Sequence, residues 1–378
     1  MKNKNIFCFF AVSAVLFTLL RFSASAESET PSTSAHAAAL YEPETKQFLY
    51  SKNINKRMPM ASTTKIMTAI VAIENSELDE SVVIADEAQG VEGSSAYLVS
   101  GEILTMEELL YALMLRSAND AAAAIAYHIS GGIEEFADLM NEKATRLGLL
   151  DTHFTNPHGL DDKEHYTTAH DLAIIAANAL ENDTLKEIIG TYKKSFSSDE
   201  HTRTYVNHNT LLKLCDGAIG VKTGFTKKSG RCLVGAVERD GLTFVTVTLN
   251  APDDWRDHSA LFELGYESLE KISLADKEEY SYDLSVLDGE AQTVRVKNEQ
   301  DASIIVEKGE HEVDSYIKLA RFAVAPIKQG DILGEVIFTV DGERVSSVKL
   351  VAEREVIKKD TRSFFEKLID KFKINKGN

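Results

Sequence analysis

The chain reads ASTTKIMTAIVAIEN at residues 61–75, with Ser62 and Lys65 at the start of a strongly apolar segment. Within this segment apolar residues recur every three or four positions, which predicts a helix. Two short β-like runs, residues 37–41 and 47–50, precede it and are separated by a polar turn. The sequence therefore predicts a strand pair that leads into a helix, with Ser62 near the helix start.

Lys65 follows Ser62 by three residues, so a helix places the two side chains on one face. A serine hydroxyl is a good nucleophile only when a base removes its proton. A lysine can be that base only when it is neutral, which burial or a neighbouring cation favours. The alternative is a helix-capping serine beside a surface lysine. The Ser-x-x-Lys spacing alone does not distinguish a nucleophile and its base from a capping serine and a surface lysine. The same spacing recurs at Ser268/Lys271, Ser315/Lys318 and Ser346/Lys349.

A second motif, Ser117-Ala118-Asn119, interrupts two helical patterns at residues 106–115 and 121–129. One interpretation places the Ser117 hydroxyl and the Asn119 amide in a cleft. The other makes the triplet a cap for the second helix, since serine and asparagine favour such positions. The triplet by itself is more typical of a cap.

The third motif, Lys222-Thr223-Gly224, ends a predicted strand over residues 218–223. A polar turn is predicted at 225–229, followed by strands at 232–237 and 242–249, which together form an antiparallel meander. Lysine and threonine on such a strand offer a charge and a hydroxyl to a carboxylate, and a strand edge can pair with an extended peptide. The alternative is an exposed lysine on an edge strand.

The three motifs in this order resemble those of the serine penicillin-binding enzymes. Within that group the chain is similar to the low-molecular-weight D-alanyl-D-alanine carboxypeptidases, and residues 254–258 resemble the branch active in spore cortex formation. The resemblance implies an α/β (α+β) transpeptidase-like catalytic domain, also shared with serine β-lactamases, in which helices flank an antiparallel sheet. It covers about residues 30–270 and rests on longer phrases at 61–68, 114–121, 156–160 and 220–226.

The resemblance also implies a mechanism. Ser62 would attack the carbonyl of the penultimate D-alanine of a peptidoglycan stem peptide, with Lys65 as the base. Ser117 would relay the proton to the leaving amine, with Lys222 as its cationic partner, and water would then hydrolyse the acyl-enzyme. The backbone N–H groups of Ser62 and Phe225 would form the oxyanion hole.

Substrate binding is assigned by the same resemblance. Asn119 would hold the substrate backbone and Lys65. In the third motif, which ends at Gly224, Thr223 would bind the terminal carboxylate. A β-lactam mimics the dipeptide end and is expected to acylate Ser62. Two rival functions remain: a β-lactamase, although no Glu-Pro-x-x-Asn-like loop is found, and a penicillin-sensing or cell-wall binding module that does not turn over.

The chain departs from its relatives at Asn207-His208-Asn209, where many carry a basic residue in place of His208. Histidine is only partly charged near neutral pH. If His208 helps to bind the carboxylate, activity should rise as the pH falls toward 6; a loop histidine without a role is the alternative. The other histidines of this region are expected to have surface or capping roles: His153, His158, His165, His170 and His201.

The segments outside the catalytic domain suggest export. Residues 1–26 read as a signal peptide with an Ala-x-Ala cleavage site, and an uncleaved anchor is the alternative. Residues 27–272 are assigned to the catalytic domain. Short alternating runs at 273–356 predict a small all-β domain. Residues 357–378 carry seven basic and three acidic residues beside an apolar stripe, which predicts a helix on a membrane surface. A helix that packs on the β-rich domain or binds a partner is the alternative.

The net charge of −18 argues against a nucleic-acid partner, because phosphate binding needs a basic surface. No cysteine and histidine spacing resembles a metal site, so no cofactor is expected. Cys215 and Cys232 permit one disulfide in an exported chain. The predicted meander places Cys232 opposite the region of Val221 and Cys215 further back, which favours two free thiols. The expected location is the outer face of the cytoplasmic membrane.

Overall fold

A computed structural model describes residues 31–197, 202–363 and 366 of the 378-residue chain. The predicted signal peptide (1–26) and most of the predicted terminal helix (357–378) lie outside this part. Among the described residues, no helix has both the length and the apolar character needed to cross a membrane.

The first domain, predicted to be catalytic, is built on a five-stranded antiparallel sheet with the order β2-β1-β9-β8-β7. Both predicted strand pairs are present. The strands are β1 (Ala37–Glu42), β2 (Gln47–Lys52), β7 (Ala218–Thr226), β8 (Gly230–Arg239) and β9 (Leu242–Leu249). Strand β7, which carries the third motif, lies at the edge of the sheet. It runs through Thr226, so the predicted turn at 225–229 begins too early and Phe225 belongs to the strand.

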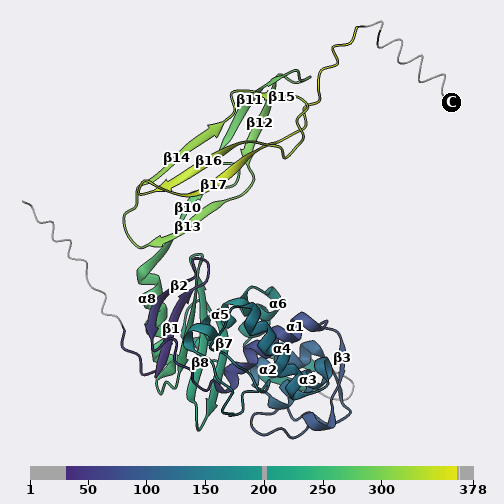
Figure 1. Cartoon of the computed structure of the whole chain (residues 1–378), viewed down its shortest axis with the longest axis vertical. Coiled ribbons are helices and arrows are strands. Elements are labelled where there is room, and N and C mark those ends of the chain that lie inside the picture. Colours follow the sequence, from purple (N-terminus) through teal and green to yellow (C-terminus); the bar gives the residue numbers. More distant parts are fainter. Residues whose placement is uncertain (1–30, 198–201, 364–365, 367–378) are drawn as a thin grey trace, which may run out of the picture. The chain divides into compact units, whose positions relative to one another are not determined.

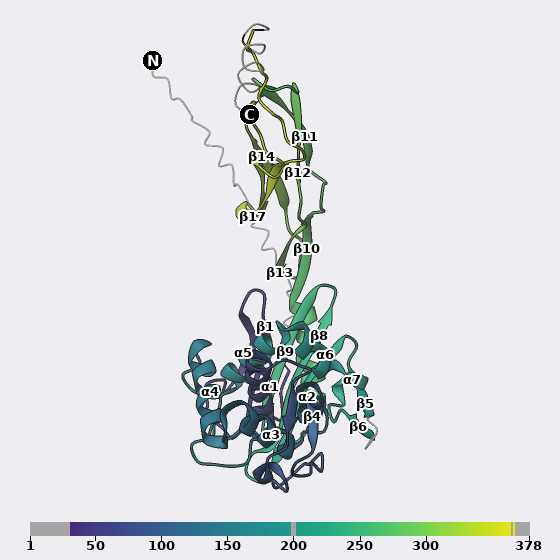
Figure 2. The same ribbon diagram turned by 90° about the vertical axis from the view of Figure 1, so that its right-hand side faces the viewer.

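Helices cover both faces of this sheet (Figures 1 and 2). Alternate strand residues explain the two layers: Ala37 and Ala39 of β1 join the larger apolar core, whereas Leu40 joins a smaller core with Phe244 and Phe262. The smaller core lies under α8 (Asp254–Ser268). The larger core contains the apolar faces of α1 (Lys65–Asn75), α2 (Met106–Leu115), α3 (Asn119–Ser130), α4 (Ile133–Arg146), α5 (Ala169–Leu180) and α6 (Asp183–Gly190).

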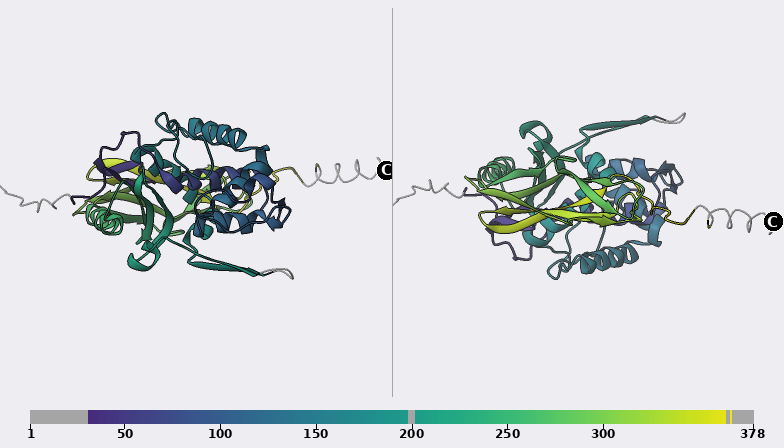
Figure 3. Two further views of the ribbon diagram at one scale, coloured as in Figure 1. Left: turned by 90° about the horizontal axis from the view of Figure 1, so that it is seen from below. Right: turned by 90° about the horizontal axis from the view of Figure 1, so that it is seen from above.

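Shorter elements frame the helical layer. Thr105 and Glu108 form a reciprocal capping box at the start of α2, which satisfies two backbone N–H groups there. The hairpin of β5 and β6 projects from the domain (Figure 3). The bounds are η1 (Ala61–Thr64), β3 (Ser81–Val83), η2 (Asp86–Ala88), β4 (Ile103–Thr105), β5 (Lys193–Ser197), β6 (Thr202–Val206) and α7 (Leu211–Leu214).

The second domain is all β, as predicted, and it has its own apolar core around Val296, Val336 and Phe338. One sheet pairs β10 with β13, and the other has the order β14-β16-β17-β12-β11-β15. The sequence missed β10 and β15, and the boundary placed at 272/273 falls inside β10. The strands are β10 (Leu269–Ala275), β11 (Ser281–Leu287), β12 (Thr293–Asn298), β13 (Ala302–Glu307), β14 (Val313–Leu319), β15 (Ala323–Val324), β16 (Ile332–Val340) and β17 (Glu343–Ala352).

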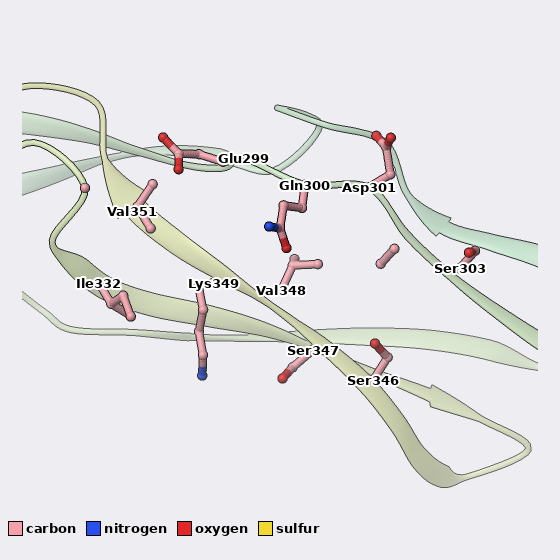
Figure 4. A pocket seen from close by; sticks show the side chains of 12 residues that line it. Glu299, Gln300, Asp301, Ser303, Ile332, Ser346, Ser347, Val348, Lys349 and Val351 are labelled. Atoms are coloured by element: carbon pink, nitrogen blue, oxygen red, sulfur yellow. The ribbon is translucent and has the colours of Figure 1, made fainter. Parts of the chain in front are cut away.

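A polar pocket of about 570 Å³ lies in this domain, between β17 and the segment before β13 (Figure 4). Its lining contains hydroxyl, amide and charged side chains, among them Gln300, Ser346 and Lys349. None of the site residues predicted from the sequence belongs to it.

Candidate active site

Ser62 lies in the tight turn η1, directly before α1. The residues at the two N-cap positions are Met60 and Thr64, and neither makes a side-chain cap bond. The capping alternative for Ser62 is therefore wrong. Its hydroxyl faces a groove, and Lys65 Nζ lies 3.0 Å from Ser62 Oγ.

Lys65 is completely buried. Besides Ser62, its amine contacts Asn119 Oδ1 at 2.7 Å and the backbone carbonyl oxygen of His158 at 2.5 Å. Burial, and then the nearby positive charge of Lys222, holds the pKa of Lys65 well below its usual range. An amine in this environment is able to stay neutral and accept a proton from a hydroxyl beside it.

Ser117 connects α2 to α3 in a left-handed conformation, with φ of +62°. A residue other than glycine in this region costs roughly 1–3 kcal/mol, and such strain concentrates at functional sites. The N-cap residue of α3 is Ala118 and has no side-chain cap bond, so Ser117 does not cap the helix. It lines the same groove as Ser62.

Asn119 is the first residue of α3 and is buried. Its amide oxygen contacts Lys65, and its amide nitrogen donates to the carbonyl oxygen of Glu92. Gly93 has φ of +103°, and a Cβ there would lie 2.6 Å from Asn119 Nδ2. The loop at residues 92–98 thus supports the second motif, a role that its sequence did not indicate.

The third motif brings Lys222 into the same buried region. Lys222 is 1% exposed, and its amine contacts the carbonyl oxygen of Thr223 at 3.0 Å. Burial lowers the pKa of Lys222 to about 7. Two buried amines, Lys65 and Lys222, therefore lie near one another, and the positive charge of Lys222 adds to burial in making the charged form of Lys65 less favourable.

The rest of β7 lies against η1 (Ala61–Thr64), the nucleophile turn that carries Ser62. A Cβ on Gly224 would lie 3.0 Å from the backbone nitrogen of Ser62, so glycine permits this close approach. The Phe225 side chain is 66% exposed at the mouth of the groove. Because β7 is an edge strand, its outward backbone groups are open to pairing with an extended chain.

His208 reaches the same groove. Burial, with the positive charges of Lys222 and Arg116, lowers the pKa of His208 from its ordinary value. The imidazole is thus less charged at neutral pH than an isolated histidine. His165, by contrast, is buried, at 3% exposure, and the expectation of a surface or capping role for it is wrong.

The groove has a volume of about 330 Å³ and joins residues from all three motifs. Lys65, Asn119 and Lys222 lie beneath it and do not line it. The sequence missed Ser94 and Arg231, for which no motif gave a signal, and it assigned no site role to Asp254 or Trp255. The lining residues are Ser62, Ser94, Ser117, His208, Thr223, Gly224, Phe225, Arg231, Cys232, Asp254 and Trp255.

Both cysteines of the described part of the chain are free, as predicted. The strand register differs from the expected one, however: Cys232 of β8 pairs with Gly224, and Val221 pairs with Gly235. Within the same described residues, no cluster of histidine, cysteine and carboxylate side chains is suited to a metal ion.

Comparisons with known proteins agree across both domains. A family model described as D-alanyl-D-alanine carboxypeptidase matches residues 24–253, and one described as penicillin-binding protein 5, C-terminal domain, matches residues 269–358. The D-alanyl-D-alanine carboxypeptidase DacF of Bacillus subtilis is 31% identical over 344 residues, which are 88% of each chain.

Solved structures show the same similarity. Penicillin-binding protein 5 of Haemophilus influenzae is 27% identical with a TM-score of 0.63, over 87% of this chain and 99% of the other. A peptidoglycan synthesis regulatory factor (PBP3) of Streptococcus pneumoniae is 26% identical with a TM-score of 0.68, over 86% and 100% of the two chains.

Proposed function

The chain belongs to the D-alanyl-D-alanine carboxypeptidase family, and we propose that it removes the terminal D-alanine from peptidoglycan stem peptides through an acyl-enzyme on Ser62. The observation that carries this role is the 3.0 Å approach of the Lys65 amine to the Ser62 hydroxyl in a buried site. The activity itself is a serine-type hydrolysis, in common with the family.

Acylation begins when Lys65 takes the hydroxyl proton as Ser62 Oγ attacks the carbonyl carbon of the penultimate D-alanine. Negative charge then develops on the carbonyl oxygen, and the backbone N–H groups of Ser62 and Phe225 donate to it. Losing one such donor costs on the order of 10²–10³ in rate in a well-studied protease. The close approach of Gly224 to the Ser62 nitrogen supports this assignment by placing β7 beside that N–H.

Breakdown of the tetrahedral intermediate requires a proton for the departing amine. Ser117 relays it: its hydroxyl gives a proton to the amine and regains the one that Lys65 took from Ser62, with Lys222 as the cationic partner beneath the groove. Free D-alanine leaves, a water molecule attacks the ester carbonyl, and Ser62 regains its proton. The left-handed backbone at Ser117 supports this role, because it turns a short polar side chain into the groove.

Recognition follows from the charge and shape of the same groove. Thr223 offers a hydroxyl and Lys222 a positive charge to the terminal carboxylate, while the β7 edge pairs with the peptide backbone. Asn119 holds Lys65 and the substrate backbone. A β-lactam presents a carboxylate and a reactive carbonyl at similar positions, so it acylates Ser62 and acts as an inhibitor.

A synthetic pentapeptide ending in D-Ala-D-Ala tests the reaction class. After incubation with the protein, mass spectrometry should show the loss of one alanine. A parallel measurement of the lifetime of the penicilloyl adduct separates the rivals: rapid release of penicilloate with an intact pentapeptide would indicate a β-lactamase. A stable adduct with an intact pentapeptide would indicate a sensing module. The carboxypeptidase relatives do not favour either rival.

The pH profile of kcat/KM is expected to be bell-shaped. Lys65 must be neutral to act as a base, so activity rises with pH as this amine loses its proton. Lys222 must be charged to attract the carboxylate, and because burial lowers its pKa to about 7, activity falls above about pH 7. A profile that stays level from pH 7 to 10 would contradict this role of Lys222.

His208 makes a smaller contribution to the same profile. A protonated His208 adds a positive charge near the carboxylate, so KM should fall as the pH falls. Because the pKa of His208 is lowered by burial and by Lys222, this gain should come below pH 6.5. The His208→Lys variant should keep a low KM at neutral pH, and an unchanged KM in this variant would favour a histidine without a role.

We propose further that the chain is exported and held at the outer face of the cytoplasmic membrane. Support comes from the sequence of residues 1–26 and from the basic, amphipathic pattern of residues 357–378. A chain that ends at Lys359 is expected to stay in the supernatant when anionic vesicles are pelleted. The chain that keeps residues 360–378 should pellet, and salt should release it. Equal pelleting of the two chains would exclude the anchor.

A further inference from the structure

The peptide bond between Ala61 and Ser62 is held from one side by a chain of hydrogen bonds. Ala61 has φ of +49°, a left-handed conformation that is strained for alanine. Its carbonyl oxygen accepts a hydrogen bond from Thr64 Oγ1 at 2.8 Å. Behind it lies Gly159, where a Cβ would come within 2.0 Å of the same oxygen. The carbonyl of Ala61 is therefore confined.

His165 is the next member of this chain. Its Nδ1 accepts a hydrogen bond from the backbone N–H of Thr155 at 3.0 Å, and its Nε2 lies 2.8 Å from Thr64 Oγ1. Thr64 gives its own proton to Ala61, so it must accept at the other contact. Nε2 therefore carries the proton of a neutral imidazole. Burial lowers the pKa of His165 to about 4, which keeps this form at neutral pH.

A planar trans peptide directs its C=O and its N–H to opposite sides. Fixing the carbonyl of Ala61 therefore also fixes the direction of the Ser62 N–H. A Cβ on Gly159 would come closest to the oxygen of this peptide, whereas a Cβ on Gly224 would lie 3.0 Å from its nitrogen, so the edge strand passes beside the nitrogen. The same N–H is an oxyanion donor in the proposed function. It stabilises the transition state fully only if it is oriented before the charge develops.

We infer that His165 is a positioning residue, which acts through Thr64 to orient the Ser62 N–H toward the developing oxyanion. This inference rests on the proposed function and adds to it a residue that touches neither substrate nor the reacting atoms. It also explains why a buried histidine lies beside the nucleophile turn without contacting Ser62 or Lys65 through its ring nitrogens.

The structure offers a matched control next to Thr64. Thr63 is also buried, and its hydroxyl donates to the carbonyl oxygen of Met60 at 2.7 Å, one peptide away from the oxyanion donor. Thr63→Val and Thr64→Val therefore remove the same group and the same kind of bond from the same turn. Only Thr64→Val breaks the connection from His165 to Ala61.

Steady-state kinetics and infrared spectroscopy of the penicilloyl-enzyme test the inference on the full chain. Thr64→Val and His165→Leu should lower kcat by about 10–100-fold, less than the 10²–10³ lost with a whole donor, while KM stays constant. The ester C=O stretch should move to higher wavenumber, because the carbonyl loses a hydrogen bond. His165→Gln, which can still donate to Thr64, should recover most of the loss, and Thr63→Val should keep the wild-type kcat and stretch.

The outcomes separate the inference from the function on which it rests. If the wild type is not acylated and does not release D-alanine, the proposed function fails. If the wild type reacts and His165→Leu keeps its kcat and its ester stretch, only the positioning role fails, whatever happens to thermal stability. Equal effects of Thr63→Val and Thr64→Val would likewise overturn it. Because the bonds act in series, Thr64→Val combined with His165→Leu should be no slower than the slower single variant.

Discussion

Replacing Ser62 with alanine is expected to abolish both D-alanine release and labelling by a fluorescent penicillin. The hydroxyl forms the covalent bond to the acyl group, and no other described residue of the groove has the Lys65 amine beside its hydroxyl. Loss of a nucleophile lowers kcat by on the order of 10⁶ in a well-studied serine protease. Gel fluorescence and mass spectrometry of the pentapeptide measure the two losses.

Ser346 provides the matched control for this experiment. It stands in another Ser-x-x-Lys sequence, with Lys349, but both residues lie on strand β17, and Lys349 contacts Glu335 at 3.2 Å. Residues three apart on a strand point to opposite faces, so this pair cannot converge on one carbonyl. Ser346→Ala should keep full labelling. Labelling that survives Ser62→Ala would refute the assignment of the nucleophile.

Replacing Lys65 with methionine is expected to lower the rate of acylation by at least about 10⁴. A general base alone contributes about 10²–10⁴ in rate. A nucleophile and its base act as one unit, so loss of the base costs nearly as much rate as loss of the nucleophile. Methionine keeps the length of the buried side chain while removing the amine near Ser62. Stopped-flow measurement of penicillin binding should separate the slow acylation step from an unchanged initial affinity.

The double variant and a control sharpen this prediction. Lys65→Met combined with Ser62→Ala should be no slower than Ser62→Ala alone, because the base has no function without the nucleophile. Lys349→Met removes the amine of the corresponding pair in the β-rich domain and should leave acylation unchanged. Rapid acylation of a folded Lys65→Met protein would show that another group activates Ser62.

Local patterns predicted the arrangement of the elements because they depend on neighbouring residues only. The helical periodicity after Ser62 and the apolar runs of strands β8 and β9 reflect burial of these elements, which a short window of sequence reveals. The end of β7 was placed too early because Phe225 to Ser229 has turn-like composition, yet pairing of Phe225 with Arg231 extends the strand. Pairing across strands overrides local preference.

At the site, too, local motifs were informative and contacts between distant segments were not predicted. The three motifs predicted that Ser62, Lys65, Ser117 and Lys222 form one set. The structure places the two serines at one groove and the two lysines in the buried region beneath it. His165 was misjudged, because a histidine in a loop sequence is usually exposed. His165 is buried only because residues 153–167 fold back onto the nucleophile turn, and no local pattern encodes that contact.

The sequence by itself determined the chemistry available to this protein: which side chains exist, in which order, and on which kinds of local element. The tertiary structure decided which of them share an environment. Burial of Lys65 and Lys222 near each other lowers the pKa of both amines, and this effect depends on the exclusion of water by segments far apart in the chain. In the sequence Lys65 is an ordinary cation, and the fold lowers its pKa, as the proposed role of a base requires.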